Sequence, residues 1–353
     1  MSKRVVHVAL CLLVVSLLVI STVATSQQGI MVQDALGRSV NLSRPPQRVV
    51  VLAPSITEIL ADLGLLDVVV GADSYSLSSW YLDAGDRLKR QGVVDVGGYW
   101  WSVIRVEEVL KLTPDLVLAD AGAHRPLLET FDAYNVTTIF LHGGSAKSVS
   151  DVLVDIYLVG QVFNKTEEAR GLADRIMVSL EEGRSRLAPY HGKKVLVVVG
   201  FWQGIWVAGR GTYIDDVLAR LGLRNAAQSI GWSLANIEVI ASWSPDIIVV
   251  AAPDYTEEAA RQAGLYNLNK PVIPLNQTEI DIVSRPGPLV AMIPSVLERA
   301  LQKAYGEAKI ETPATQTPQE QRLVVDLPTL ALIVTIAAVA FFIAGYTLGL
   351  RRK

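Results

Sequence analysis

The chain has 353 residues, half of them hydrophobic and 19% charged, which is enough for two domains with sizeable cores. The formal net charge of −3 gives no reason to expect nucleic acid as a partner. The single cysteine, Cys11, lies in an apolar N-terminal run, so the rest of the chain has no means to form a disulfide or a cysteine-ligated metal site.

Both ends of the chain carry membrane signals. Residues 1–26 combine a basic start, an apolar run and small residues before Gln27, which is typical of a cleaved signal peptide. A retained first membrane helix is the alternative. Residues 307–326 predict a stalk. The apolar segment 327–350 is longer than the about 20 residues that a helix needs to cross a bilayer. The basic residues 351–353 predict a cytoplasmic tail, so we expect a single-pass protein of the cell membrane with an extracytoplasmic body.

Strands and helices alternate after the signal peptide, which predicts an N-terminal α/β lobe, residues 27–165, around a parallel sheet. A hairpin is expected over residues 32–40. In the first helix, Ser55 and Glu58 have the spacing of a capping box. The expected strands are residues 48–52, 68–70, 116–119 and 138–141, and the expected helices are residues 54–64, 127–134 and 148–162.

A long helical segment follows, residues 166–187, with a second capping-box spacing at Asn164 and Glu167. Its length of about 33 Å suits a rigid connector between lobes, although a surface helix within one lobe is the alternative. Residues 188–306 predict a C-terminal lobe of the same kind. Its expected strands are residues 194–199, 247–252 and 272–274, and its expected helices are residues 214–221, 256–262 and 289–305.

One motif occurs in both lobes, which suggests that the lobes are similar. Trp101, Glu107 and the Pro114-Asp115 turn return, at the same spacing, as Trp232, Glu238 and Pro245-Asp246. An apolar strand follows each turn. Ser102 and Asn236 are expected to cap the two helices and to place both glutamates in a first turn, where the helix dipole favours a carboxylate.

Aromatic residues are frequent in segments predicted to be loops at strand ends: Tyr75, Tyr99, Trp100, Trp101, Trp202, Trp206 and Trp232. The carboxyl ends of parallel strands form the ligand crevice in such folds. We therefore expect a cleft between the lobes whose flat aromatic surfaces suit a large planar ligand. A core role is the alternative for each tryptophan.

Catalytic signals are few. The sequence has no Gly-x-Ser-x-Gly motif, and His124, His142 and His191 are scattered. The glycine-rich turn at residues 209–212 lacks the lysine of a phosphate loop. We expect no enzyme activity, no catalytic residues, no bound metal and no cofactor, while His124 stays open as one ligand to the metal of a haem or corrinoid.

The segment from Arg48 to Glu58, Val70-Gly71, both Pro-Asp turns and the central helix resemble the substrate-binding proteins of iron-siderophore, haem and cobalamin ABC importers. The resemblance covers about Asp34 to Tyr305. It implies two α/β lobes joined by one rigid helix, a ligand cleft between them, and delivery of the ligand to a permease dimer with its ATPase subunits.

Within that family the resemblance is strongest to the cobalamin-binding members. It implies corrin contacts at Tyr75, Trp101, Trp206 and Trp232, further ligand contacts at Asp281 and Arg285, and permease docking through Glu107 and Glu238. Tyr99, Trp100 and Trp202 are additional aromatic candidates for the ligand site. The chain departs from the family pattern in these extra aromatics, in an insertion before Asp281 and in its C-terminal anchor.

Two alternatives stay open. The ligand is a ferric siderophore or haem if the cleft is rich in arginine, for which Arg125, Arg210 and Arg285 are candidates. From another class, the body is a membrane-anchored extracellular enzyme or an adhesion module.

Overall fold

The structure is a computed structural model that describes residues 29–306. The predicted signal peptide, stalk, membrane helix and cytoplasmic tail lie outside the described residues. Between residues 29 and 306 no single helix is long and apolar enough to cross a membrane. One pair, Gln277–Ser284 with Pro288–Tyr305, meets that test only jointly and is bent by 116°.

The N-terminal lobe is built on a five-stranded sheet in the order β5-β4-β3-β6-β7, and every neighbouring pair is parallel. Every residue of β3, β6 and β7 is buried, which fits apolar strands covered on both faces. A separate antiparallel hairpin joins β1 to β2, as predicted. The strands are β1 (Ile30–Gln33), β2 (Ser39–Leu42), β3 (Val49–Val51), β4 (Val69–Ala72), β5 (Val94–Asp95), β6 (Leu116–Asp120) and β7 (Thr138–Leu141).

Six α-helices of this lobe lie within the described residues: α2 (Pro54–Asp62), α3 (Ala84–Arg90), α4 (Val106–Lys111), α5 (Ala121–His124), α6 (Leu128–Ala133) and α7 (Val149–Val162). The predicted cap of α2 by Ser55 is wrong. Ala53 is the N-cap residue, Pro54 occupies the first helical turn, and Ser55 and Glu58 are buried inside the helix. Pro54 therefore marks the start of α2, because a backbone N–H in the first helical turn would have no partner within the helix.

The C-terminal lobe has a six-stranded sheet in the order β11-β9-β8-β12-β13, with β10 also paired to β8. Its strands are β8 (Lys194–Gly200), β9 (Ile205–Ala208), β10 (Arg224–Asn225), β11 (Trp232–Ala235), β12 (Ile247–Val250) and β13 (Val272–Pro274). The expected parallel sheet is confirmed for β10, β8, β12 and β13, whereas β9 runs antiparallel to both β8 and β11. The reversal follows from Gln203 and Gly204, which have φ angles of 57° and 144°.

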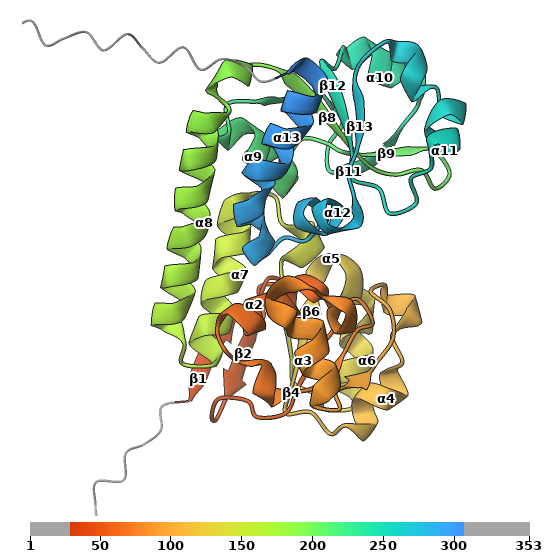
Figure 1. Cartoon of the computed structure of the whole chain (residues 1–353). Helices are drawn as coiled ribbons and strands as arrows, with labels where there is room; N and C mark the ends of the chain where they lie inside the picture. The colour runs from red at the N-terminus through yellow and green to blue at the C-terminus, as the bar shows by residue number, and fades with distance from the viewer. Residues whose placement is uncertain (1–28, 307–353) are drawn as a thin grey trace, which may run out of the picture. The chain divides into compact units, whose positions relative to one another are not determined.

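The helix α8 (Thr166–Arg186) is confirmed, and it packs against α7 from the N-terminal lobe and against α9 (Tyr213–Arg220) and α13 (Ile293–Tyr305), as can be followed in Figure 1. Its predicted capping box is absent, since Lys165 is the N-cap residue and makes no side-chain cap. The other helices are α10 (Ile237–Trp243), α11 (Glu257–Gln262) and α12 (Gln277–Ser284). The predicted helix at residues 289–305 begins as a 3-10 segment, Pro288–Met292.

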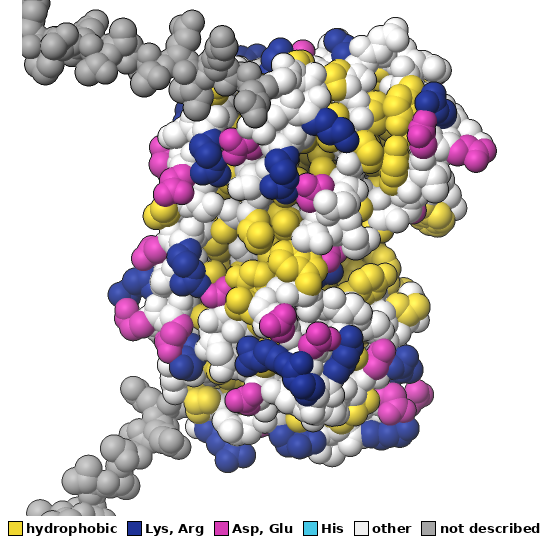
Figure 2. All heavy atoms as spheres, in the orientation of Figure 1, with side chains coloured by type: hydrophobic (Ala, Val, Ile, Leu, Met, Phe, Trp, Pro, Cys, Tyr) yellow, Lys and Arg dark blue, Asp and Glu magenta, His cyan; other side chains and the backbone are white. Residues whose placement is uncertain are grey.

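One buried apolar cluster includes residues of both lobes, such as Val51 of β3 and Val249 of β12, together with Ile176 of α8. All described residues therefore belong to one compact unit. In Figure 2, basic and acidic side chains are interspersed on the visible face, and hydrophobic side chains gather near its middle. The connecting helix is thus part of the core, which favours a stiff connection between the lobes.

Candidate functional site

Four of the predicted aromatic contacts have strongly exposed side chains. Tyr75, Trp100, Trp101 and Trp202 are 55%, 60%, 48% and 65% exposed. Exposed apolar side chains that gather into a patch mark contact surfaces, and Trp100 and Trp101 are neighbours in the sequence. Trp206 and Trp232 are less exposed, and both lie on strands, β9 and β11, instead of the loops that were predicted.

Tyr99 is held by a polar network. Its hydroxyl donates to Asp120 Oδ2 at 2.7 Å, and Asp120 also accepts from the backbone N–H groups of Gly122 and Gly144. Burial and the nearby Asp120 raise the pKa of Tyr99 above its ordinary value, so the hydroxyl stays protonated. The Tyr99 hydroxyl is thus occupied by Asp120. Trp100 and Trp101, which come next in the sequence, are exposed beside this fixed residue.

His124 is fully buried, and both of its ring nitrogens are engaged. Nδ1 accepts from the Asp120 N–H at 3.0 Å, and Nε2 therefore donates to the Tyr99 carbonyl oxygen at 2.6 Å. Burial lowers the pKa of the ring, which keeps it neutral. The hypothesis that His124 ligates the metal of a haem or corrinoid is wrong, because no nitrogen lone pair is left to a ligand.

Trp232 makes a contact across the boundary between the lobes. Its Nε1 donates to the Gly144 carbonyl oxygen of the N-terminal lobe at 2.9 Å, and its ring lies 6.0 Å from that of Tyr213. Trp101 and Trp232 are not in ring contact within the described residues. The indole of Trp232 is therefore oriented by the opposite lobe before any ligand arrives.

Asp281 and Arg285 lie on and just after α12, and they are paired with each other. Arg285 Nη2 lies 2.8 Å from Asp281 Oδ2, and Arg285 Nη1 donates to Glu58 Oε1 of the N-terminal lobe at 2.6 Å. Trp80 Nε1, also from the N-terminal lobe, donates to Asp281 Oδ2 at 3.1 Å. We call these four residues the boundary network. It is largely buried, with Asp281 only 7% and Arg285 only 8% exposed.

The boundary network carries more acid than base. Burial raises the pKa of Glu58 to about 7, against the opposing effect of Arg285. Burial likewise raises the pKa of the neighbouring Asp73 to about 6. Within residues 29–306, Glu58 Oε2 has no hydrogen-bond partner. The Arg285 guanidinium thus interacts with several buried carboxyl groups. The geometry of the boundary network therefore depends on how many of them are protonated.

The predicted docking glutamates are both exposed, in the first turns of α4 and α10. Neither carboxylate takes part in a hydrogen bond or an ion pair with the described residues. Asn236 caps α10 by accepting from the Val239 N–H, as predicted. The prediction for Ser102 is wrong, since Arg105 is the N-cap residue of α4 and makes no side-chain cap.

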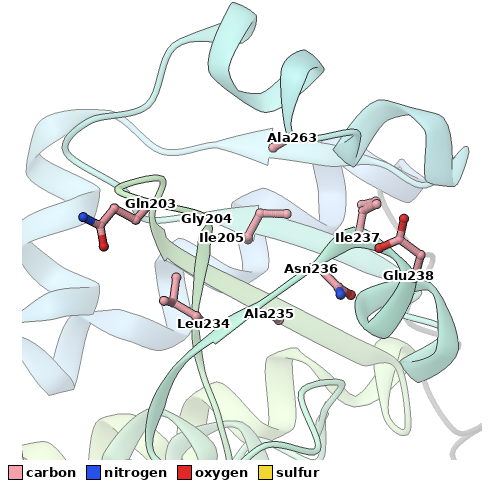
Figure 3. Close-up of a pocket in the computed structure, with 9 residues that line it drawn as sticks. All are labelled: Gln203, Gly204, Ile205, Leu234, Ala235, Asn236, Ile237, Glu238 and Ala263. Atoms are coloured by element: carbon pink, nitrogen blue, oxygen red, sulfur yellow. The ribbon is translucent and has the colours of Figure 1, made fainter.

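A pocket of about 390 Å³ lies in the C-terminal lobe beside Glu238. Its lining residues are Gln203, Gly204, Ile205, Leu234, Ala235, Asn236, Ile237, Glu238 and Ala263, and Figure 3 shows Gln203 and Glu238 at opposite ends of this group. The predicted corrin-contacting residues are not among them. The pocket therefore belongs to the predicted docking side and not to the predicted ligand site.

The sequence pattern does not point to Glu58, Asp73 or Trp80 as members of the site. Trp80 carried a detectable signal, because it follows Tyr75 in the same loop after β4. Glu58 was hidden by its capping-box spacing. Its contact with Arg285 joins residues far apart in the sequence and could not be read from local pattern.

A model of the periplasmic binding protein family matches residues 49–266, more than half of the sequence. The chain is 25% identical over 267 residues to the uncharacterized ABC transporter substrate-binding lipoprotein YvrC of Bacillus subtilis, covering 73% of this chain and 81% of YvrC. It is 26% identical over 275 residues to the vitamin B12-binding protein of Yersinia pestis, covering 77% and 90%.

Solved structures show the same fold. The petrobactin-binding protein YclQ of Bacillus subtilis superposes with a TM-score of 0.64 at 20% identity, covering 78% of this chain and 99% of YclQ. An α/β body of two sheet-based lobes is common to them. The match over residues 49–266 shows that the chain belongs to the periplasmic binding protein family, a family of non-enzymatic substrate-binding proteins.

Proposed function

We propose that this protein is the extracytoplasmic solute-binding component of an ABC importer, and that it captures cobalamin or a related corrinoid and delivers it to the permease. The observation that carries the proposal is the placement of aromatic residues from both lobes at one boundary. Trp80 contacts Asp281 across it, and Trp232 contacts Gly144 across it. The likeness to a vitamin B12-binding protein over 90% of that protein's length supports the same ligand class.

The ligand site would use the rings of Tyr75 and Trp101 from the N-terminal lobe and of Trp206 and Trp232 from the C-terminal lobe. Flat rings suit the broad, partly apolar face of a corrin. Tyr99, Trp100 and Trp202 would extend this surface. Asp281 and Arg285 would meet polar groups of the ligand only after the boundary network loosens, since they are paired and buried without ligand.

A ferric siderophore is the second candidate ligand. Arg125 and Arg210 have exposed side chains and supply positive charge that a siderophore carboxylate or catecholate would attract. Arg285 is held by Glu58 and Asp281, which removes one of the three arginines on which this alternative depends.

Ligand class is tested by tryptophan fluorescence of the full chain in detergent, titrated with cyanocobalamin, haemin and ferric petrobactin. We expect saturable quenching by the corrinoid at the lowest concentration. Saturation by the siderophore or haemin alone would transfer the assignment to that ligand. No saturable response to any of the three would contradict the proposed function.

Membrane attachment is part of the proposal. Residues 1–26 would direct export, residues 307–326 would form a stalk, and residues 327–350 would hold the body at the outer side of the cell membrane. The lobes would comprise residues 27–165 and 188–306. Carbonate extraction of membranes should leave the full chain in the pellet and release a chain that ends at Gly306. Release of both would refute the anchor.

A further inference from the structure

The two predicted docking glutamates have different surroundings. In the first copy of the repeat, Glu107 is flanked by Arg105 and Glu108, and Lys111 interacts electrostatically with both glutamates. In the second copy, the positions of Arg105, Glu108 and Lys111 are taken by Asn236, Val239 and Ser242. The local charge that partly compensates Glu107 is thus absent from the sequence around Glu238.

The pocket lies on the second copy. Apart from Glu238, every residue that lines it is uncharged, and Ile205, Leu234, Ile237 and Ala263 give it apolar walls. Leu234 is 48% exposed and Val239 is 40% exposed, so the apolar surface continues to the outside. The strand that carries Leu234, β11, is the end strand of its sheet. An exposed apolar edge of this kind is a place where other chains bind.

We propose, resting on the proposed function, that the C-terminal lobe makes the dominant contact with the permease, through a permease segment that pairs an arginine or lysine with Glu238 and inserts an adjacent apolar side chain into the pocket. Charge complementarity defines the occupant: an exposed carboxylate that has no ion-pair partner among residues 29–306 stands at one end of an otherwise uncharged pocket (Figure 3). Binding energy concentrates in pockets that lose all water on docking, with uncharged neighbours that exclude solvent.

Glu107 would make the weaker contact. A cation that approaches it enters a surface where Arg105 and Lys111 already interact with the nearby carboxylates, so a new ion pair gains less. Its neighbourhood also stays hydrated, because Arg105 pairs with Asp95 at 2.9 Å and Lys111 pairs with Glu108 at 2.7 Å. Exposed ion pairs of this kind contribute little. Docking is therefore unequal, although the sequence motif is shared.

The test measures binding of the full chain to the organism's permease–ATPase complex in lipid nanodiscs. Glu238→Gln should weaken binding about tenfold or more, and Glu107→Gln about threefold or less. Leu234→Ser removes an apolar wall and should weaken binding about fivefold, while Val103→Ser, at the equivalent position of the first copy and 53% exposed, should change it less than about twofold. Ala263→Phe, which fills the pocket, should act like Leu234→Ser.

Thermal unfolding of each variant checks that a loss of binding does not reflect unfolding. Equal losses for Glu107→Gln and Glu238→Gln, or an Ala263→Phe variant that binds like the wild type, would overturn the inference and leave the proposed function intact. A wild-type chain that binds neither the complex nor any corrinoid would overturn both. Self-association of the wild type that Ala263→Phe abolishes would assign the pocket to a second copy of this chain.

Discussion

In the first copy of the repeat, Trp101 begins a short 3-10 segment before α4, whereas in the second copy Trp232 begins strand β11, which leads into α10. The Pro-Asp turns nevertheless match closely. Thr113 and Ser244, which precede the two prolines, both have positive φ angles of 44° and 52°. Asp115 accepts from the Arg48 N–H ahead of β3, and Asp246 accepts from the Lys194 N–H at the start of β8.

The difference lies in what each copy contacts. The first copy is surrounded by charge and anchored within its own lobe through Tyr99 and Asp120. The second copy is nearly uncharged, reaches the other lobe through Trp232 and borders the pocket through Glu238. The Pro-Asp turn thus has the same local backbone in both copies, while the residues around it differ in charge and in what they contact.

The largest expected effect would come from breaking one of the contacts between the two lobes. Arg285→Ala leaves Glu58 and Asp281 buried without their cation, and such a loss destabilises a fold by about 3–5 kcal/mol. Urea unfolding followed by circular dichroism measures it. Arg125→Ala, which changes an exposed arginine, is the control and should stay within about 0.5 kcal/mol. Equal stability of the two variants would show that the boundary network is not structural.

The same network predicts that the free energy of unfolding depends on pH through Glu58, its acidic residue in the N-terminal lobe. The pKa of Glu58 is about 7 in the folded protein against 4.5 in the unfolded chain, so the folded state binds the proton more tightly. Glu58 therefore stabilises the fold most below about pH 4.5, and this contribution is lost as the pH rises through 7. Between pH 5 and 8 the unfolding free energy of the wild type should fall by roughly 2 kcal/mol relative to Glu58→Gln. A constant difference would contradict the raised pKa.

The matched turns allow a direct comparison of the two copies. Asp115 accepts from two backbone N–H groups, those of Gln47 and Arg48, whereas the Asp246 carboxylate accepts from one, that of Lys194. We expect Asp115→Ala to cost about 2 kcal/mol and Asp246→Ala about 1 kcal/mol in unfolding free energy. Asn substitutions, which keep an acceptor oxygen, should recover part of each loss. A larger loss at Asp246 would mean that the turns are not equivalent.

The smallest effect separates the two tryptophans. Trp232→Phe removes the N–H that donates to Gly144 and should cost about 1 kcal/mol, while Trp101→Phe removes no hydrogen bond of the described residues and should cost less than about 0.5 kcal/mol. Thermal unfolding of the two variants gives the comparison. Equal losses of stability in the two variants would show that the hydrogen bond from Trp232 to the other lobe does not stabilise the fold.

Local sequence pattern located several of the buried elements closely. The predicted strands over residues 138–141 and 272–274 coincide with β7 and β13, and the predicted helix over residues 166–187 differs from α8 by one residue. Apolar β-branched runs have few other ways to be buried in a parallel sheet. The family resemblance reached the same two-lobed α/β body.

The predictions that failed depended on partners distant in the sequence. Trp206 and Trp232 were predicted to lie in loops, but their segments pair with each other as antiparallel strands. The expected helices left residues 275–288 without a helix, whereas Asn276 and Glu279 form a capping box that begins α12 there. Glu58 had the spacing of a cap, but Ala53 and Pro54 already start that helix, which leaves Glu58 to face Arg285.

Binding of one corrinoid by aromatic rings from both lobes is best tested by equilibrium dialysis of the full chain against cyanocobalamin. We predict one saturable site, weakened about tenfold or more by Trp101→Ala and likewise by Trp232→Ala, because each removes a large flat contact from a different lobe. Retention of cyanocobalamin that neither substitution changes, or no saturable retention by the wild type, would contradict the account.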